Sequence, residues 1–224
     1  MRRILVICLC LALLALAGFS WREESSRRAA RNLPPPSVTK LPVNFVQRTF
    51  DPANPPSDMP PMNPGEDARC DSDFGSKAAV GGQIRRVDAT HGVLTITQIT
   101  VTVQLGITIW VPVGVTPHVV EHEEGHRQIS ESYYQSADKL AARIADGYMG
   151  RPIDIAGADL EAESHKALEQ AASDITAEYN RELNTEPAQL LYDSITDHSR
   201  NEVVSTEAVS HALKNVSVEY RQAN

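Results

Sequence analysis

The chain has 224 residues, with 21 basic and 29 acidic side chains and a formal net charge of −8 at pH 7. This length suits one domain with a sizeable core once the ends of the chain are set aside. The acidic balance argues against a nucleic-acid-binding protein, because the neutralisation of phosphates by basic side chains dominates such affinity. The only basic run, residues 22–31, is short and is better explained as a solvated linker.

The first twenty residues have the features of a secretory signal peptide. Arg2 and Arg3 give a positive start, an apolar run covers residues 4–16, and residues 15–17 (Ala-Leu-Ala) offer a cleavage site. A membrane-spanning helix needs about 20 apolar residues, which is longer than this run. We therefore expect a secreted or periplasmic protein, cleaved after residue 17 or 20, without stable membrane insertion after cleavage. An uncleaved N-terminal anchor is the alternative.

Cleavage would remove two of the three cysteines, Cys8 and Cys10, and leave only Cys70. An internal disulfide is then impossible, so stability must come from the core or from a bound metal. Residues 21–66 form the next segment, and ten of the fourteen prolines of the chain lie in it. Because this composition buries little apolar surface, the sequence predicts a disordered, Pro-rich linker.

Residues 67–224 have the pattern of a folded domain. Runs rich in β-branched residues predict strands at 93–101 and 103–113, with a possible earlier strand near 83–87. Helical spacing of apolar residues follows, with Thr116 as an N-cap and Pro117 in the first turn. Because the strands precede the helices, we expect an α+β fold, with a small antiparallel sheet followed by a helical bundle. The predicted helices are residues 117–146, 159–183 and 201–220.

Residues 122–126, His-Glu-Glu-Gly-His, have the form H-E-x-x-H. On a helix, His122 and His126 lie one above the other and can bind one zinc ion. Glu123 points about 100° away around the helix axis, so its carboxylate can act as a general base on a water molecule at the metal. Gly125 has a low helix propensity, which fits a position that a strand or a substrate approaches closely.

A catalytic zinc site usually has a third protein ligand. Residues 192–198 (Tyr-Asp-Ser-Ile-Thr-Asp-His) gather polar groups in a short stretch between two predicted helices, where catalytic groups are often displayed. An ordinary helix start is the alternative interpretation. Tyr192 could donate a hydrogen bond to an oxyanion or could pack the loop onto the core. The candidates for the third ligand are Glu161, Glu163, His165, Glu178, Asp193, Asp197 and His198.

Residues 110–129 (WVPVGVTPHVVEHEEGHRQI) and residues 192–202 (YDSITDHSRNE) together resemble the bacterial secreted proteins of the DUF922 family, described as zinc-dependent proteases. Position 199 is Ser, where that family tends to have Gly. The resemblance implies a zincin-like domain in which His122 and His126 bind zinc and Glu123 is the catalytic base. His198 is the preferred third ligand, with Asp193 or Glu178 as the alternatives.

The sequence thus predicts an exported zinc metallopeptidase that acts on a protein or peptide substrate, with Tyr192 and Glu123 as catalytic residues. Two other functions stay open. The domain could be a non-catalytic envelope protein with a structural zinc ion, or a zinc amidase acting on a non-protein substrate such as a cell-wall amide. The H-E-x-x-H geometry serves amide hydrolysis in general, so the sequence does not separate these possibilities.

Overall fold

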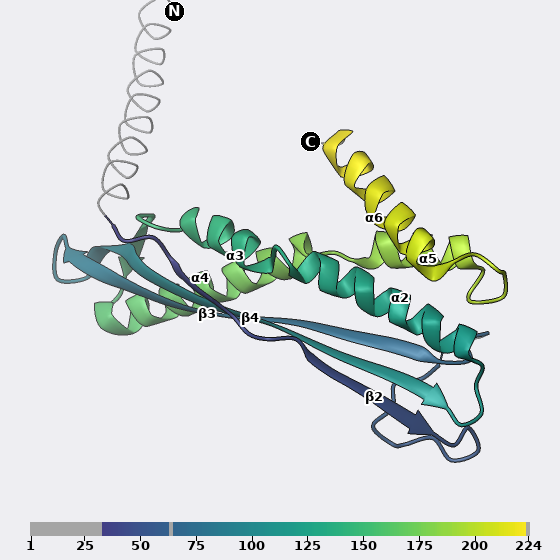
Figure 1. Ribbon diagram of the computed structural model, residues 1–224. Helices are drawn as coiled ribbons and strands as arrows, with labels where there is room; N and C mark the ends of the chain where they lie inside the picture. The colour runs from purple at the N-terminus through teal and green to yellow at the C-terminus, as the bar shows by residue number, and fades with distance from the viewer. Residues whose placement is uncertain (1–32, 63–64, 223–224) are drawn as a thin grey trace, which may run out of the picture. The chain divides into compact units, whose positions relative to one another are not determined.

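The computed structural model describes residues 33–62 and 65–222 (Figure 1). The predicted signal peptide, residues 1–20, and the first part of the predicted linker, residues 21–32, lie outside the described residues. None of the helices in the described ranges combines the length and the apolar character needed to cross a membrane.

The fold is α+β, and its sheet is organised around one long strand. This strand, β4 (His91–Pro112), covers both strands that the sequence predicts at 93–101 and 103–113. Its buried residues alternate with less buried ones along most of its length, as expected when one face of a sheet packs on a core. The neighbouring strand β3 (Arg69–Arg86) is joined to β4 by only four residues, so the two must run antiparallel.

Three further strands pair with β4. Strand β2 (Asn44–Phe50) lies parallel to it, with Asn44 opposite Gly106. Strand β5 (Pro152–Ala156) lies antiparallel to it, and β1 (Ser37–Lys40) is also its neighbour. The prediction of an antiparallel sheet is therefore wrong. The exception is β2, which runs parallel to β4. Strand β3 lies between β2 and β4 in the sequence and reverses the chain direction, so β2 and β4 point the same way.

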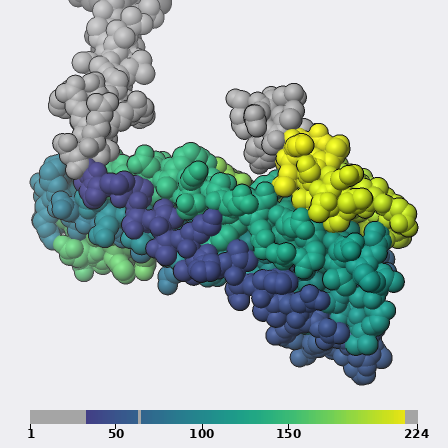
Figure 2. Space-filling view, in the orientation of Figure 1, coloured from purple at the N-terminus to yellow at the C-terminus, as the bar shows by residue number. Residues whose placement is uncertain are grey.

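The predicted disordered linker is ordered where it is described. Residues 37–50 form β1 and β2, and residues 51–62 form turns held by hydrogen bonds such as Ala53 N to Asp51 Oδ1 at 2.9 Å. Figure 2 shows these purple-to-blue residues as a continuous band over the surface. Backbone hydrogen bonds to β4 order the strands, which composition alone does not reveal.

The helices agree with the prediction in part. Helix α2 (Pro117–Tyr134) begins after Thr116 as expected, but residues 135 and 136 separate it from α3 (Ala137–Asp146). Helix α4 (Leu160–Glu182) matches the predicted helix at 159–183. Helix α6 (Ser205–Gln222) begins four residues later than predicted. Helix α5 (Glu186–Thr196) is missed, because Pro187 stands in its first turn, a position that proline tolerates.

The chain divides into two compact units. Of the described residues, the first contains 33–37, 78–101 and 142–175, and its core joins Leu94 and Ile155 on the sheet to Leu160 on α4. The second contains the described residues of 38–77, 102–141 and 176–222. In this second unit α2, α5 and α6 pack together around Ile129, Tyr192 and Ala212.

Candidate metal centre

The two histidines of the H-E-x-x-H motif face Asp193 of α5. His122 and His126 lie one turn apart on α2, and their Nε2 atoms are 3.2 Å from each other. Asp193 Oδ1 is 3.3 Å from His122 Nε2 and 2.9 Å from His126 Nε2. Ligands about 2.0–2.1 Å from a tetrahedral zinc ion are about 3.3 Å apart, so these three atoms have the spacing of one face of such a site.

The hydrogen bonds of Gln189 fix the tautomer of His126. The side-chain nitrogen of Gln189 lies 3.3 Å from the His126 carbonyl oxygen and 3.0 Å from Ser130 Oγ, so this nitrogen is the donor end of the amide. The amide oxygen is then the atom that lies 2.6 Å from His126 Nδ1 and accepts its proton. His126 Nε2 is left with a free lone pair when the ring is neutral.

Thr196 acts on His122 in a similar way. Its hydroxyl donates to the carbonyl oxygen of Tyr192, one turn earlier in α5, at 2.9 Å. With its single proton used there, the hydroxyl accepts from His122 Nδ1, which is 3.2 Å away. In the neutral rings, the Nε2 lone pairs of His122 and His126 therefore face the same point in space. Two lone pairs this close repel each other unless a cation lies between them.

Asp193 adds negative charge to the same place. Burial would raise the pKa of its carboxyl, but the two neighbouring imidazole rings, when they carry protons on Nε2, outweigh this effect and hold the pKa well below its usual range. Its Oδ1 atom is buried and accepts no hydrogen bond of good geometry from the described residues. A buried anionic oxygen without a partner is costly, so this arrangement fits a bound cation.

Glu123 lies in the same cavity as the three ligand atoms. The cavity has a volume of about 260 Å³, and its walls include Glu66 and Cys70 from the sheet side. Glu123 is only 5% exposed, and burial raises the pKa of its carboxyl to about 7. A carboxyl group with a pKa near neutrality can both accept and release a proton, which suits acid–base chemistry.

Burial also acts on the histidines. It lowers the pKa of His122, which favours the neutral ring that a metal requires. Burial lowers the pKa of His126 too, but the Asp193 carboxylate outweighs it and raises the pKa of this ring. Asp193 raises the pKa of both rings, but only that of His126 is also raised by Glu123 and Gln189, so the two rings differ in their affinity for a proton.

Tyr192 does not fit the predicted role of oxyanion donor. Its side chain is fully buried, and its hydroxyl donates to the His122 carbonyl oxygen at 3.1 Å and lies 2.8 Å from Ser205 Oγ. Its ring stacks on His122, with 5.0 Å between ring centroids, and is not part of the cavity wall. Tyr192 therefore supports the histidines from behind, which is the packing alternative that the sequence left open.

Gly125 makes this packing possible. A Cβ atom at this position would stand 2.1 Å from the Tyr192 hydroxyl oxygen, far inside contact distance. The sequence predicted a close approach at Gly125 by a strand or a substrate. The approach is present, but the group that makes it is the tyrosine of α5.

His198 lies beside the three ligand atoms but does not join them. Its Nδ1 is 3.6 Å from Asp193 Oδ1 and its side chain is 43% exposed. The atoms of His122, His126 and Asp193 that could hold a metal lie within 4.8 Å of one another, and His198 is outside this group. Among the described residues, the structure thus favours Asp193, the stated alternative, over His198.

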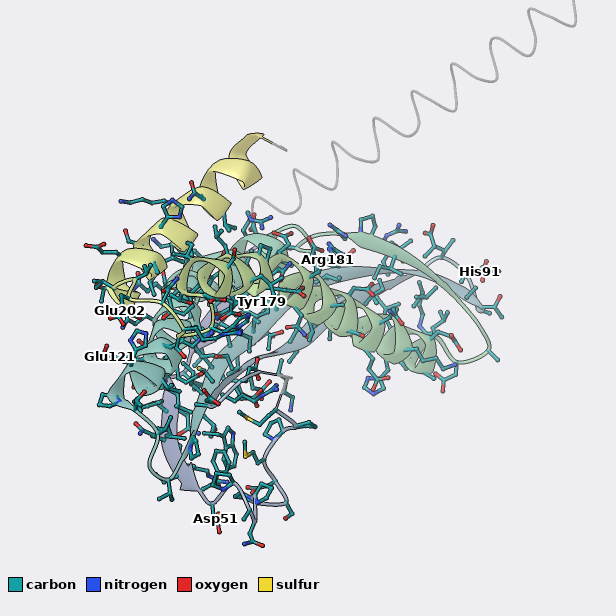
Figure 3. The ribbon with its side chains drawn as sticks, turned by 90° about the vertical axis from the view of Figure 1, so that its right-hand side faces the viewer. Asp51, His91, Glu121, Tyr179, Arg181 and Glu202 are labelled. Atoms are coloured by element: carbon teal, nitrogen blue, oxygen red, sulfur yellow. The ribbon has the colours of Figure 1, made fainter. Side chains whose placement is uncertain are left out.

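The turn that carries His198 is strained. Asp197, His198 and Ser199 have φ angles of 48°, 52° and 65°, in the left-handed region that favours glycine. Ser199 is the position where DUF922 proteins tend to have Gly, and its φ angle gives a physical reason for that preference. Figure 3 labels Glu202, which follows this turn, and Glu121 on α2.

The remaining candidates for the third ligand lie elsewhere. Glu178 on α4 is not part of the cavity wall, and the same holds for the exposed His165, whose Nε2 lies 3.2 Å from Glu169. Sequence reasoning missed Gln189 as a partner of the metal ligands. A signal was present, since residues 189, 192, 193 and 196 are spaced three and four apart, which is the spacing of one helix face.

Comparison of the chain with protein-family models, with curated proteins and with solved structures gives no match. The resemblance to the DUF922 proteins stays a prediction that depends on the two motifs alone. The geometry around His122, His126 and Asp193 is independent of that resemblance.

Proposed function

We propose that this protein is an exported zinc-dependent hydrolase, specifically a metallopeptidase, whose zinc ion is held by His122, His126 and Asp193. The observation that carries the proposal is the triangle of three ligand atoms, 2.9 to 3.3 Å apart. Its donor set, two imidazoles and one carboxylate, is of the kind that holds catalytic zinc. Export, the peptide substrate and the metal identity come from the sequence motifs.

Three protein ligands would leave one position of a tetrahedral zinc ion free for water or substrate. Zinc bound there would polarise a carbonyl group and make a water molecule acidic enough to react at neutral pH. Gln189 and Thr196 would hold the two imidazole rings in place through Nδ1, so that neither ring must reorient when the metal binds.

Glu123 is the general base of this proposal. Its carboxylate shares the cavity with the three ligands and is removed from bulk solvent. It would take a proton from the attacking water and pass that proton to the leaving amine.

The first test compares two neighbouring glutamates of the motif. Glu123→Gln should bind one zinc ion per chain and lose hydrolysis of a peptide library. Glu124→Gln is the control, because Glu124 pairs with Arg127 on the partly exposed side of α2 and should keep activity. Full activity of Glu123→Gln, or a wild-type protein that binds no zinc, would contradict the proposal.

The same experiment distinguishes the two other functions. A protein that binds zinc, loses stability with chelator and cleaves no peptide or amide would be the structural-zinc protein. Cleavage of cell-wall amides without cleavage of peptides would identify an amidase. The open cavity beside the ligands supports a catalytic rather than a structural site, since structural zinc usually has four protein ligands.

A further inference from the structure

A second cavity lies next to the candidate metal centre, within the same compact unit. Its volume is about 810 Å³, which falls in the range of about 300–1,000 Å³ typical of pockets for small ligands. Glu66, Asp67, Val119 and Ser199 line both this cavity and the metal cavity. The two cavities therefore adjoin each other at these four residues.

The walls of this second cavity are mostly apolar. The end of β2 and the proline-rich turns contribute Phe50, Met59 and Met62, and the segment between β4 and α2 contributes Val113 and Val115. Methionine side chains adapt their shape to different apolar groups. Such walls offer little to a charged or strongly polar group, which would lose its water without finding hydrogen-bond partners.

The proline-rich wall is held in shape before any ligand arrives. Val113 N donates to the Phe50 carbonyl oxygen at 2.9 Å, and Met59 N donates to the Pro56 carbonyl oxygen at 3.1 Å. Arg48 forms an ion pair with Asp58 across the same turns. Prolines also restrict the backbone in the absence of ligand, so closing this wall around a ligand requires little further ordering.

The border between the two cavities is acidic. Glu66 and Asp67 stand there, so a negatively charged substrate group that passes from one cavity to the other meets two carboxylates. Arg200 also lines the second cavity, but its side chain is 61% exposed and its Nε lies 4.0 Å from Asp197. The two border carboxylates and the apolar walls therefore favour large uncharged side chains over acidic ones.

We infer that the second cavity is a specificity pocket, which receives a large aliphatic or aromatic side chain of the substrate residue adjoining the scissile amide. This inference rests on the proposed function and names the class of substrate for the same site. Val113 and Met59 are then residues that determine specificity, and the prolines of residues 52–61 are the frame that holds one wall.

The test uses amino-acid hydroxamates, whose hydroxamate group binds zinc while the side chain varies. Calorimetry on the zinc-loaded protein should give leucine and phenylalanine hydroxamates an affinity about 10- to 100-fold higher than glycine hydroxamate. Sequencing of the products from a peptide library should place a large apolar residue next to the cleaved bond. Equal affinity for glycine and leucine hydroxamates would overturn the inference.

Two matched variants place the preference in this cavity. Val113 is 68% exposed, so Val113→Glu should fold and should lower the affinity for leucine hydroxamate about tenfold, with that for glycine hydroxamate unchanged. Val87, 61% exposed between β3 and β4, supplies the control Val87→Glu, which should change neither affinity. If Val87→Glu lowers the affinity for leucine hydroxamate as much as Val113→Glu does, or if Val113→Glu leaves that affinity unchanged, the second cavity is not the specificity pocket.

The two proposals fail in different ways. If the protein binds the hydroxamates with the apolar preference but cleaves no peptide, the proposed peptidase function is wrong and the pocket stands. If the protein cleaves peptides without regard to the neighbouring side chain, the peptidase function stands and the pocket is wrong.

Discussion

The two compact units of this protein differ in what they bury. The first unit buries apolar side chains such as Leu94 and Ile155. Among its described residues, the one buried polar side chain is Ser164, whose hydroxyl donates to a carbonyl oxygen of its own helix. The second unit buries His122, Glu123 and Thr196 beside its core. Burying ionisable groups costs free energy unless a partner compensates them.

This difference indicates that the functional site lies in the second unit. A domain under selection for stability alone is expected to bury mainly apolar side chains, as the first unit does. The second unit instead keeps two imidazoles and two carboxylates close together, with fixed tautomers and one unpartnered carboxylate oxygen. Groups arranged in this way are typical of functional sites. The following predictions compare matched positions in the two units, from the largest expected effect to the smallest.

Two glycines give the largest expected difference. Gly125→Ala in α2 should lower the free energy of unfolding by about 3 kcal/mol, because its Cβ would collide with the buried Tyr192 ring. Gly81→Ala in β3 of the first unit meets only ordinary contacts at 3.5 Å and should change this free energy by less than about 0.5 kcal/mol. Denaturant titration of both variants checks the prediction, and equal effects would contradict the packing described for Tyr192.

Zinc should stabilise the two units unequally. At a free zinc concentration about 100 times its Kd, binding stabilises the protein by about 2.7 kcal/mol. Hydrogen exchange should show this protection in α2 and α5, which carry the ligands, and much less in β5 and residues 160–175. Uniform protection, or none, would argue against a metal site in the second unit.

The hydroxyl of Thr196 gives a smaller effect that concerns zinc affinity. Thr196→Val removes the acceptor for His122 Nδ1 and should weaken zinc binding about 10- to 100-fold, as loss of a partner behind a metal ligand usually does. Ser164→Ala in the first unit is the matched control and should leave zinc affinity unchanged. Competition with a chelating dye measures both. An unchanged affinity of Thr196→Val would show that the tautomer of His122 is fixed in another way.

Substitution of two serines by glycine should change the free energy of unfolding in opposite directions. Ser199→Gly should raise the free energy of unfolding by about 1 kcal/mol, because a residue with a φ angle of 65° is strained unless it is glycine. Ser164→Gly, inside α4, should lower it by about 1 kcal/mol through the poor helix propensity of glycine. Thermal unfolding of the two variants measures the signs, and a loss of stability in Ser199→Gly would contradict the strain.

The sequence predicts the helix that carries His122 and His126, because capping residues, apolar spacing and motif all agree there. It does not predict β2, since proline-rich composition says nothing about a strand that is ordered by pairing with β4. It also misses α5, because a proline such as Pro187 can end one helix or stand in the first turn of the next, and the sequence alone does not separate these cases.

The differences between the predicted and the observed site follow from the missed helix. With residues 192–198 expected between two helices, the sequence leaves open His198 or Asp193 at the metal, and Tyr192 as an oxyanion donor or a packing residue. As part of α5, Tyr192 and Asp193 both face α2, with the Asp193 carboxylate at the Nε2 atoms of the histidines and the Tyr192 hydroxyl at the His122 carbonyl oxygen behind them. Helix geometry decides which side chain reaches the metal, and that geometry depends on tertiary packing that a single sequence does not contain.

The most direct test of the account is the zinc content of two purified variants. Asp193→Ala should lose the metal, because it removes one of the three ligand atoms, and His198→Ala should retain about one zinc ion per chain. Both variants would first be shown to fold by circular dichroism. Zinc retained by Asp193→Ala and lost by His198→Ala would contradict the metal site described for His122, His126 and Asp193.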